Sequence, residues 1–149
     1  KYSLDSCLAC RHLHGHQAEV EVFLSSSILN QESMVTDFTN LNFFKEFLDT
    51  SLDHKFIIDI HDPLYDHLIP LPITLTLDDT KRGKSNRIMT EYGYEIIDLS
   101  LYKDYPIHMI EMLESFVIVN FVPTSENLSK WIYEIVSAKL KLYNINVDS

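Results

Sequence analysis

Residues 10–25 read CRHLHGHQAEVEVFLS, a run in which potential metal-binding and acid–base groups lead directly into an alternating pattern. From Gln17 to Ser25, apolar side chains of one parity alternate with polar side chains of the other, which predicts a half-buried β-strand. The apolar parity, traced backwards, reaches a cysteine and three histidines: Cys10, His12, His14 and His16. We therefore expect an extended backbone to place four such groups on the inner side, at the rim of the core.

The pair His14-Gly15-His16 is the sharpest local signal in this run. Histidines two apart on a strand share a face, and with a third donor they can hold Zn²⁺ and leave one position open. Two surface histidines also occur at this spacing by chance. Cys10 can be a zinc ligand, an inert buried thiol, or a reactive thiolate, and its spacing from His14 does not choose among these.

A helix is expected next along the chain. Asp37 or Thr39 can cap it. Its apolar positions recur at helical spacing, namely Leu41, Phe44, Phe47, Leu48 and Leu52. The helix should end near Asp53, where Asp53 can orient the imidazole of His54 for acid–base work. The alternative, more common for such a pair, is a histidine that interacts favourably with the helix dipole.

Two further segments have strong patterns in the second half of the chain. Residues 115–122 are nearly all apolar and β-branched, which predicts a strand buried on both faces. After Pro123, Thr124 or Ser125 can cap a second helix. Its predicted inner face comprises Leu128, Trp131, Ile132, Ile135 and Leu142. The order of strand, helix, several strands and helix predicts an α+β fold with both helices on one side of the sheet.

The intervening segment has weaker patterns. Asp62-Pro63 should break regular structure, and residues 73–77 alternate like a strand. The polar run from Lys81 to Arg87 is typical of a hairpin tip, and residues 91–101 fit another strand pair. We expect the charges of that run to be solvated, although they are also suited to cover an anionic phosphate group.

Composition restricts the class of protein. A formal net charge of −10 repels a nucleic-acid backbone, and the basic residues form no long stripe. No apolar stretch approaches the roughly 20 residues that cross a bilayer, and the start of the chain has no signal-peptide pattern. We therefore expect a cytoplasmic protein of one domain, with no nucleic-acid or membrane partner. Its two cysteines, Cys7 and Cys10, favour metal binding or catalysis over a structural disulfide.

Taken together, five blocks in this order resemble the 6-pyruvoyltetrahydropterin synthase and 6-carboxytetrahydropterin synthase family. The blocks are Cys10-x3-His14-Gly15-His16, Met34-Val35-Thr36-Asp37-Phe38, Leu52-Asp53-His54-Lys55, Asp62-Pro63 and Pro123-Thr124-Ser125-Glu126-Asn127. The resemblance implies a single pterin-synthase-like domain over residues 1–149, which we expect to be trimmed at both ends. Residues 69–113 match nothing in the family pattern, and we expect them to form an extra β-rich insertion.

The resemblance implies a tunnelling fold, in which a four-stranded antiparallel sheet has two helices on one face. In that family, trimers close a β-barrel and two trimers commonly stack as a hexamer. The implied sites lie between subunits, so the expected partners are further copies of the chain and a reduced pterin triphosphate.

The implied activity is that of a zinc-dependent lyase. It converts 7,8-dihydroneopterin triphosphate to 6-carboxy-5,6,7,8-tetrahydropterin, as in queuosine-type deazapurine biosynthesis, or to the related 6-pyruvoyltetrahydropterin. By similarity, His14 and His16 bind Zn²⁺, and Cys10 is the thiolate that abstracts a proton. Asp53 and His54 relay protons, whereas Thr124 and Ser125 hold the pterin ring. The three-residue gap between Cys10 and His14 is similar to the carboxy-forming branch.

The chain departs from the family pattern at two places. The family has a third zinc histidine upstream of the cysteine, yet residues 1–9 contain no histidine. Either that ligand precedes Lys1, or Cys7 or His12 replaces it, or the zinc site is degraded. The family's later Glu-Thr pair, which anchors the pterin, is also absent before Ser149.

Two alternatives remain open from the sequence. One is a non-catalytic tunnelling-fold protein that binds a pterin or purine. The other is a structural zinc site built from Cys7, Cys10, His12, His14 and His16, which would have no open coordination position. Removal of zinc would unfold a chain of the second kind.

Overall fold

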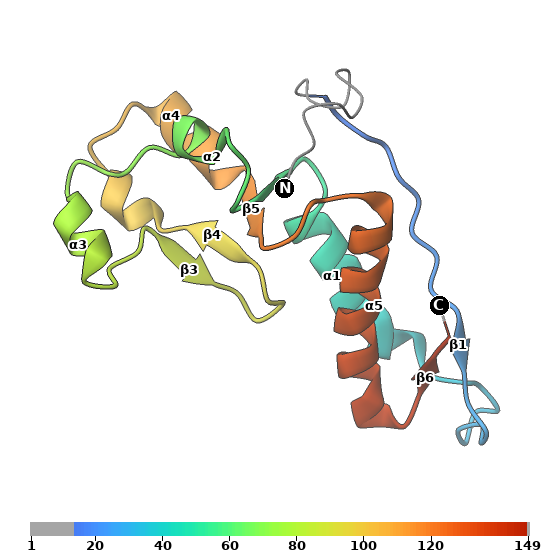
Figure 1. Ribbon diagram of the computed structural model, residues 1–149. Coiled ribbons are helices and arrows are strands. Elements are labelled where there is room, and N and C mark those ends of the chain that lie inside the picture. Colours follow the sequence, from blue (N-terminus) through green and yellow to red (C-terminus); the bar gives the residue numbers. More distant parts are fainter. Residues whose placement is uncertain (1–13, 149) are drawn as a thin grey trace.

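The computed structural model describes residues 14–148, which form an elongated α+β molecule (Figure 1). The strands are β1 (Leu24–Ser25), β2 (Phe56–Asp59), β3 (Arg87–Met89), β4 (Glu95–Ile97), β5 (Phe116–Val119) and β6 (Asn146–Val147). The α-helices are α1 (Asn42–Ser51), α2 (Tyr65–Leu68), α3 (Leu77–Lys81), α4 (Ile107–Glu114) and α5 (Ser125–Leu140). The described residues also contain the 3-10 helices η2 (Phe38–Leu41), η3 (Leu99–Tyr102) and η4 (Lys141–Tyr143). No helix within the described residues is long and apolar enough to cross a membrane.

The central sheet has four strands in the order β2-β5-β4-β3. Strand β2 runs parallel to β5, with Phe56 opposite Phe116, whereas β4 is antiparallel to both β5 and β3. The prediction of a wholly antiparallel sheet was therefore wrong. The connection between β2 and β5 is more than 50 residues long. A connection of this length can carry the chain back to the same end of the sheet, as parallel pairing requires.

The predicted first strand is mostly an extended arm rather than a member of this sheet. Only Leu24–Ser25 is regular strand, and it pairs antiparallel with β6 in a separate two-stranded sheet. The predicted parity is confirmed for Val20, Val22 and Leu24, which pack against the core at its edge. Figure 1 shows the arm running along the outer side of α5.

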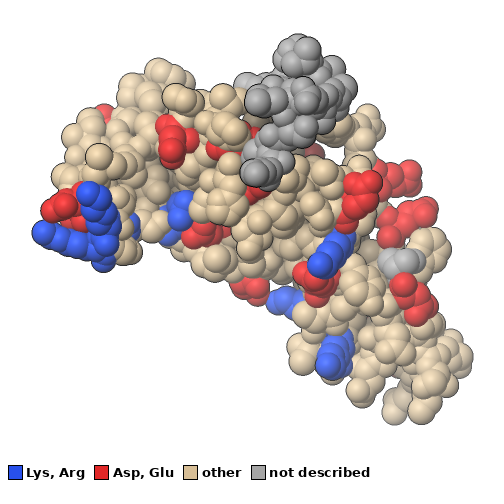
Figure 2. Space-filling model, viewed as in Figure 1, with Lys and Arg blue, Asp and Glu red and all other residues tan. Residues whose placement is uncertain are grey.

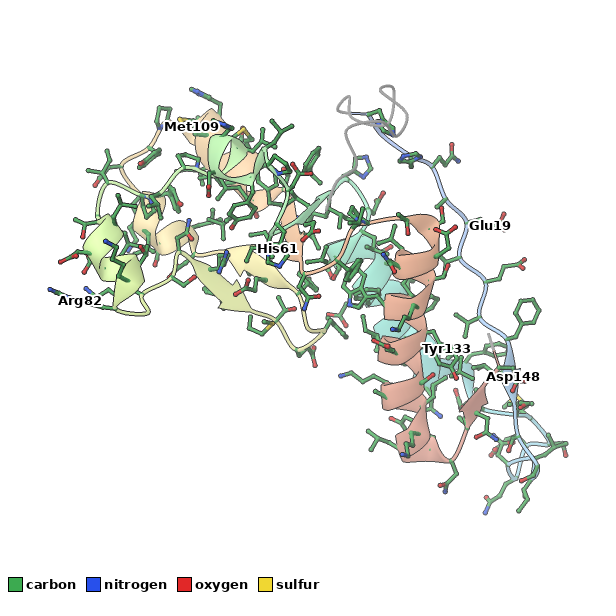
Figure 3. The ribbon with its side chains drawn as sticks, viewed as in Figure 1. Glu19, His61, Arg82, Met109, Tyr133 and Asp148 are labelled. Atoms are coloured by element: carbon green, nitrogen blue, oxygen red, sulfur yellow. The ribbon has the colours of Figure 1, made fainter. Side chains whose placement is uncertain are left out.

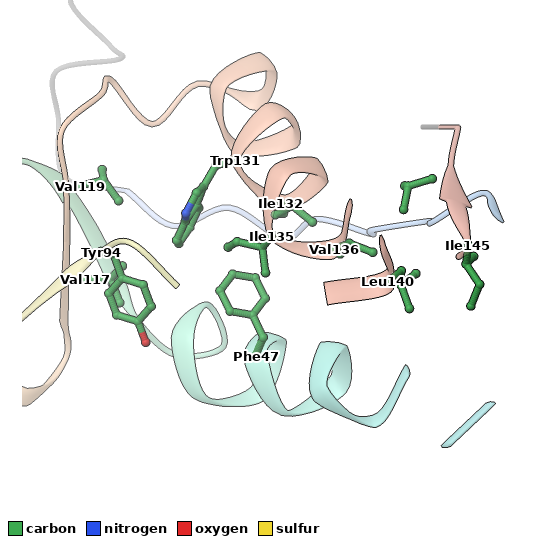
Figure 4. Packing of buried hydrophobic residues seen from close by; sticks show 11 residues of the cluster. Phe47, Tyr94, Val117, Val119, Trp131, Ile132, Ile135, Val136, Leu140 and Ile145 are labelled. Atoms are coloured by element: carbon green, nitrogen blue, oxygen red, sulfur yellow. The ribbon is translucent and has the colours of Figure 1, made fainter. Parts of the chain in front are cut away.

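Strand β5 lies at the centre of the molecule and is buried on both faces, as predicted. Its side chains Val117 and Val119 belong to a core cluster that includes residues of α1 and α5, as Figure 4 shows. Phe116 and Ile118 point to the opposite face and belong to a second cluster, which includes residues of α2 and α4. The two long helices therefore lie on one face of the sheet, as expected, and two shorter helices lie against the other.

The segment 69–113 is mixed rather than β-rich, contrary to the prediction. It contains β3 and β4 but also α3, η3 and α4. Residues 73–77 were predicted to form a strand. Instead, Thr76 caps α3 in a reciprocal capping box with Asp79, which satisfies backbone groups at the start of that helix. Local capping therefore outweighs the alternation of apolar residues.

The hairpin of this segment also lies elsewhere than predicted. The run from Lys81 to Arg87 ends α3 and leads into β3, so it is not a hairpin tip. The turn lies between β3 and β4, where the Thr90 N–H donates to the Tyr94 carbonyl and Gly93 has a φ of 77°. A positive φ is easily adopted by glycine because it lacks a Cβ.

The predicted caps are present, one directly at α5 and one at the 3-10 helix η2 that precedes α1, whose own N-cap residue Leu41 makes no side-chain hydrogen bond. The Asp37 side chain accepts from the Thr39 N–H at the start of η2, which leads into α1. Thr124 caps α5, and Glu126 lies in its first turn. Trp131, Ile132 and Ile135 are buried as predicted, but Leu142 is 79% exposed because α5 ends at Leu140, which is fully buried instead.

Candidate functional site

The two histidines of the predicted zinc site lie together on the extended arm. The ring centroids of His14 and His16 are 4.6 Å apart, with the ring planes inclined at 68°. Both residues are exposed, so the expectation that they face the core was wrong. Residues 14–23 of the described chain are not paired into a sheet that would turn one parity inward. Cys10, together with Cys7 and His12, lies outside the described residues.

Asp53 and His54 form the second group, just after the end of α1. His54 Nδ1 lies 3.0 Å from Asp53 Oδ1, and the two side chains are 93% and 67% exposed, respectively. His54 has a φ of 55°, in the left-handed region that β-carbon-bearing residues rarely adopt. The Asp53 N–H donates to the Leu48 carbonyl at 2.9 Å, which ties this turn to the helix. The predicted contact between the carboxylate and the imidazole is present, on a strained backbone.

Thr124 and Ser125 form the third group, at the start of α5. The Thr124 hydroxyl accepts from the Asn127 N–H at 3.3 Å, and Asn127 in turn donates its side-chain amide to the Val122 carbonyl. The backbone N–H of Glu126 and the Thr124 hydroxyl lower the pKa of the Glu126 carboxyl below its usual range. The arrangement presents backbone N–H groups at a helix N-terminus, where the helix dipole favours negative or electron-rich groups.

A groove of about 590 Å³ runs beside α5. Its lining includes three aromatic side chains, Tyr92, Phe121 and Trp131. Asn127, one helical turn from the Thr124 cap, also lines it, so the groove reaches the third group. No motif in the sequence indicates this groove, because Tyr92 comes from the hairpin turn, whose place beside α5 no local pattern predicts.

The cationic run Lys81 to Arg87 lies on the far end of the molecule from α5, where Figure 2 shows basic and acidic side chains intermingled. Arg82 lies 3.4 Å from Asp78, and Lys84 lies 2.8 Å from Asp79. Figure 3 labels Arg82 at this end of the molecule. The nearby acidic side chains offset much of the positive charge, which supports the interpretation of a solvated segment.

The predicted site residues thus form three small groups on three elements. The groups are the arm with His14 and His16, the end of α1 with Asp53 and His54, and the start of α5 with Thr124 and Ser125. Within residues 14–148, no three His, Cys, Asp or Glu side chains come together in a way that could hold a metal ion. In the described part of the chain, the predicted site residues therefore lie in three separate groups.

Comparisons with known proteins show which proteins the chain is similar to. A family model described as 6-pyruvoyl tetrahydropterin synthase matches residues 3–149. The chain is 28% identical over 132 residues to the 6-carboxy-5,6,7,8-tetrahydropterin synthase of Aquifex aeolicus, strain VF5. That alignment covers 89% of this chain and 59% of the relative, so the chain spans about three fifths of the relative's length.

The fold also resembles a solved structure, the crystal structure of an uncharacterized protein from Wolinella succinogenes. The match has a TM-score of 0.81 and 44% sequence identity, and it covers 97% of this chain and 74% of that chain. Because the family model covers nearly the whole sequence, the chain belongs to the 6-pyruvoyl tetrahydropterin synthase family.

Proposed function

We propose that this chain is a lyase subunit that acts on 7,8-dihydroneopterin triphosphate. The main product is 6-carboxy-5,6,7,8-tetrahydropterin, and the close alternative is 6-pyruvoyltetrahydropterin. The observation that carries the proposal is the Asp53–His54 contact of 3.0 Å, in a chain that the family model matches over residues 3–149. Support for the carboxy-forming reaction comes from the three-residue gap between Cys10 and His14, and from the name of the Aquifex relative.

Asp53 and His54 are suited to proton transfer. Imidazole changes its charge near neutral pH, and a carboxylate bonded to one ring nitrogen fixes the ring orientation and leaves the other nitrogen to exchange protons. Both side chains are largely exposed, so the pair is accessible to a substrate or to a second subunit. In the proposed reaction, His54 moves protons at the substrate side chain and Asp53 orients the imidazole.

Cys10 is proposed as the base that removes a proton from the substrate side chain. A thiolate is the reactive form of cysteine, and nearby cationic groups or a metal ion lower the pKa of a thiol. The assignment comes from the family resemblance, since Cys10 lies outside the described residues.

His14 and His16 are proposed to hold Zn²⁺. Their ring centroids are 4.6 Å apart in an edge-on contact, so the two exposed imidazoles are near enough to turn toward one ion at Zn–N distances of about 2.0 to 2.1 Å. They supply two of at least three expected protein ligands, and Cys7, His12 or a residue of another segment would supply the third. The bound ion would polarise the oxygens of the substrate side chain.

Thr124 and Ser125 are proposed to hold the pterin ring at the start of α5. The hydroxyls of Thr124 and Ser125 can donate to the carbonyl oxygen and ring nitrogens of a pterin. Because the three groups of residues lie on separate elements, we propose that a complete site forms between copies of the chain in a trimer or hexamer.

The test is to incubate the zinc-loaded protein with 7,8-dihydroneopterin triphosphate and identify the products by mass spectrometry. We expect triphosphate, acetaldehyde and a carboxylated pterin, whereas a pyruvoyl product would assign the other branch. Asp53→Asn and His54→Gln should lower turnover by about a hundredfold or more, in the range of general acid–base catalysis. His61→Gln is the matched control, because this exposed histidine belongs to none of the three groups.

The absence of turnover would contradict the proposal. If the pterin then raised the melting temperature of the protein without being converted, the chain would be a non-catalytic pterin-binding member of the family. If chelation of zinc unfolded the chain, the metal would be structural.

A further inference from the structure

The hairpin turn of the segment 69–113 is inserted between the two long helices. Tyr92 contributes its ring to Phe47 of α1, at 5.0 Å between centroids, and its carbonyl accepts from Trp131 Nε1 of α5 at 3.2 Å. Next to it, Glu91 pairs with Lys139 at 3.0 Å. The turn therefore touches α1 and α5, two of the three elements that carry groups of the candidate site.

A buried hydrogen bond gives this turn a direct connection to the end of α1. The hydroxyl of Tyr94 and the hydroxyl of Ser51 lie 2.7 Å apart, and the two residues are 7% and 0% exposed. Figure 4 shows Tyr94 among apolar side chains of the core, with its hydroxyl directed toward α1. The Ser51 hydroxyl also lies 3.4 Å from the Thr50 hydroxyl, but its shorter contact with Tyr94 gives both buried hydroxyls a hydrogen-bond partner. An alanine–phenylalanine pair would avoid the cost of burying them.

Ser51 is the last residue of α1, two positions before Asp53. Beyond it, the chain turns sharply: the N–H groups of Leu52 and Asp53 both donate to the Leu48 carbonyl, and His54 adopts a φ of 55°. A fixed Ser51 side chain limits how far the last turn can rotate or unwind. Because only two residues separate Ser51 from His54, such movement would displace the imidazole directly.

We propose that Tyr94 is a positioning residue for the Asp53–His54 pair and acts through its hydrogen bond to Ser51. The inference rests on the proposed proton-transfer role of that pair. It assigns a function to the segment 69–113, namely to hold the end of α1 in the geometry that the reaction requires. Small displacements of a reacting group lower rates strongly even when substrate binding is unchanged.

The test compares variants of the full, zinc-loaded chain with 7,8-dihydroneopterin triphosphate as substrate. Tyr94→Phe should lower kcat about tenfold and leave KM within about twofold. The matched control is Tyr102→Phe, because the Tyr102 hydroxyl is also buried and hydrogen-bonded, to Asn86 and to the Pro70 carbonyl, but belongs to the opposite core cluster. This control should lose stability without a change in kcat.

The double variant Ser51→Ala/Tyr94→Phe separates positioning from stability. Replacing both hydroxyls removes the unpaired group that either single change leaves behind, so stability should recover relative to Tyr94→Phe alone. If positioning needs the hydrogen bond, kcat stays low in the double variant. Wild-type kcat in either the double variant or Tyr94→Phe would overturn the inference.

A second readout keeps the inference independent of turnover. In the free protein, Tyr94→Phe should shift or broaden the NMR resonances of the His54 imidazole, and Tyr102→Phe should leave them unchanged. Unchanged His54 resonances in Tyr94→Phe would overturn the inference. A wild-type protein that shows no turnover, with shifted resonances in Tyr94→Phe, would contradict the proposed function and leave the positioning supported.

Discussion

His54 combines an exposed imidazole with a backbone conformation that suits glycine better. Its φ of 55° occurs in the turn that follows α1, three residues after the last helical residue Ser51, and lies in a region that glycine adopts freely. A residue with a Cβ is strained there by roughly 1 to 3 kcal/mol. We predict that His54→Gly increases the free energy of unfolding by about 0.5 to 1 kcal/mol, after the greater entropy of unfolded glycine is included. Urea unfolding measures this change.

The same variant should lose turnover, because it removes the imidazole. Asn144→Gly is the matched control, since Asn144 also has a positive φ, 57°, but lies at the end of η4. That control should be stabilised slightly, with turnover unchanged. If His54→Gly were instead less stable than the wild type, contacts of the imidazole would contribute more to stability than the backbone strain at this position costs.

At the residue scale, the sequence indicates which chemical groups are present more reliably than it indicates where their side chains lie. The neighbours Asp53 and His54 are adjacent in the sequence, so their contact was predictable. The bond between Ser51 and Tyr94 joins residues 43 positions apart, and neither belongs to a recognisable motif. The inward orientation predicted for His14 and His16 assumed an extended backbone, but both side chains are exposed, because an extended arm without strand pairing does not fix which parity faces the core.

Helix α3 shows how a short element depends on one carboxylate. A hydrogen bond from Lys84, followed by the backbone and side chain of Thr76, lowers the pKa of Asp79 from 3.8 to about 2. Because the folded-state pKa is depressed, the charged carboxylate stabilises α3 above pH 3.8, and this contribution is lost as the pH falls toward 2. We predict that the α3 amides lose hydrogen-exchange protection in this pH window.

The NMR titration of the Asp79 carboxyl measures the cause. Lys84→Met removes the largest contribution and should raise the Asp79 pKa toward 3.8. Arg82→Met is the control, because the Arg82 side chain pairs with Asp78 and should leave the Asp79 titration unchanged. An unaltered Asp79 pKa in Lys84→Met would mean that Thr76 alone determines it.

At the element scale, the helices and strands with a clear pattern of apolar residues were predictable. Strand β5 is uniformly apolar, and α5 has a cap followed by apolar residues at helical spacing, so local pattern and tertiary burial agree. The prediction of a β-rich segment 69–113 was wrong because its strands are only three residues long. Such strands are too short for alternation to be diagnostic, and the capping pair Thr76 and Asp79 was the stronger signal.

On the scale of the whole molecule, apolar side chains remain exposed around β1. Phe23 is 56% exposed, Ile28 is 79% exposed and Leu29 is 53% exposed. Strands β1 and β6 pair only with each other in the described chain, so each keeps one unpaired edge. Unpaired strand edges and exposed large apolar side chains are typical of subunit interfaces. Both features support the proposal of a trimer or hexamer that uses this region.

We predict that Phe23→Lys dissociates the oligomer, because a charge in the interface would be buried without a partner. Sedimentation velocity should show a trimer or hexamer for the wild type and a smaller species for the variant. Ile107→Lys is the matched control: Ile107 is 68% exposed but lies in α4, on the opposite face of the sheet from α1 and α5. It should sediment like the wild type. If sites form between subunits, Phe23→Lys should also lose turnover, whereas a fully active monomer would place the whole site within one chain.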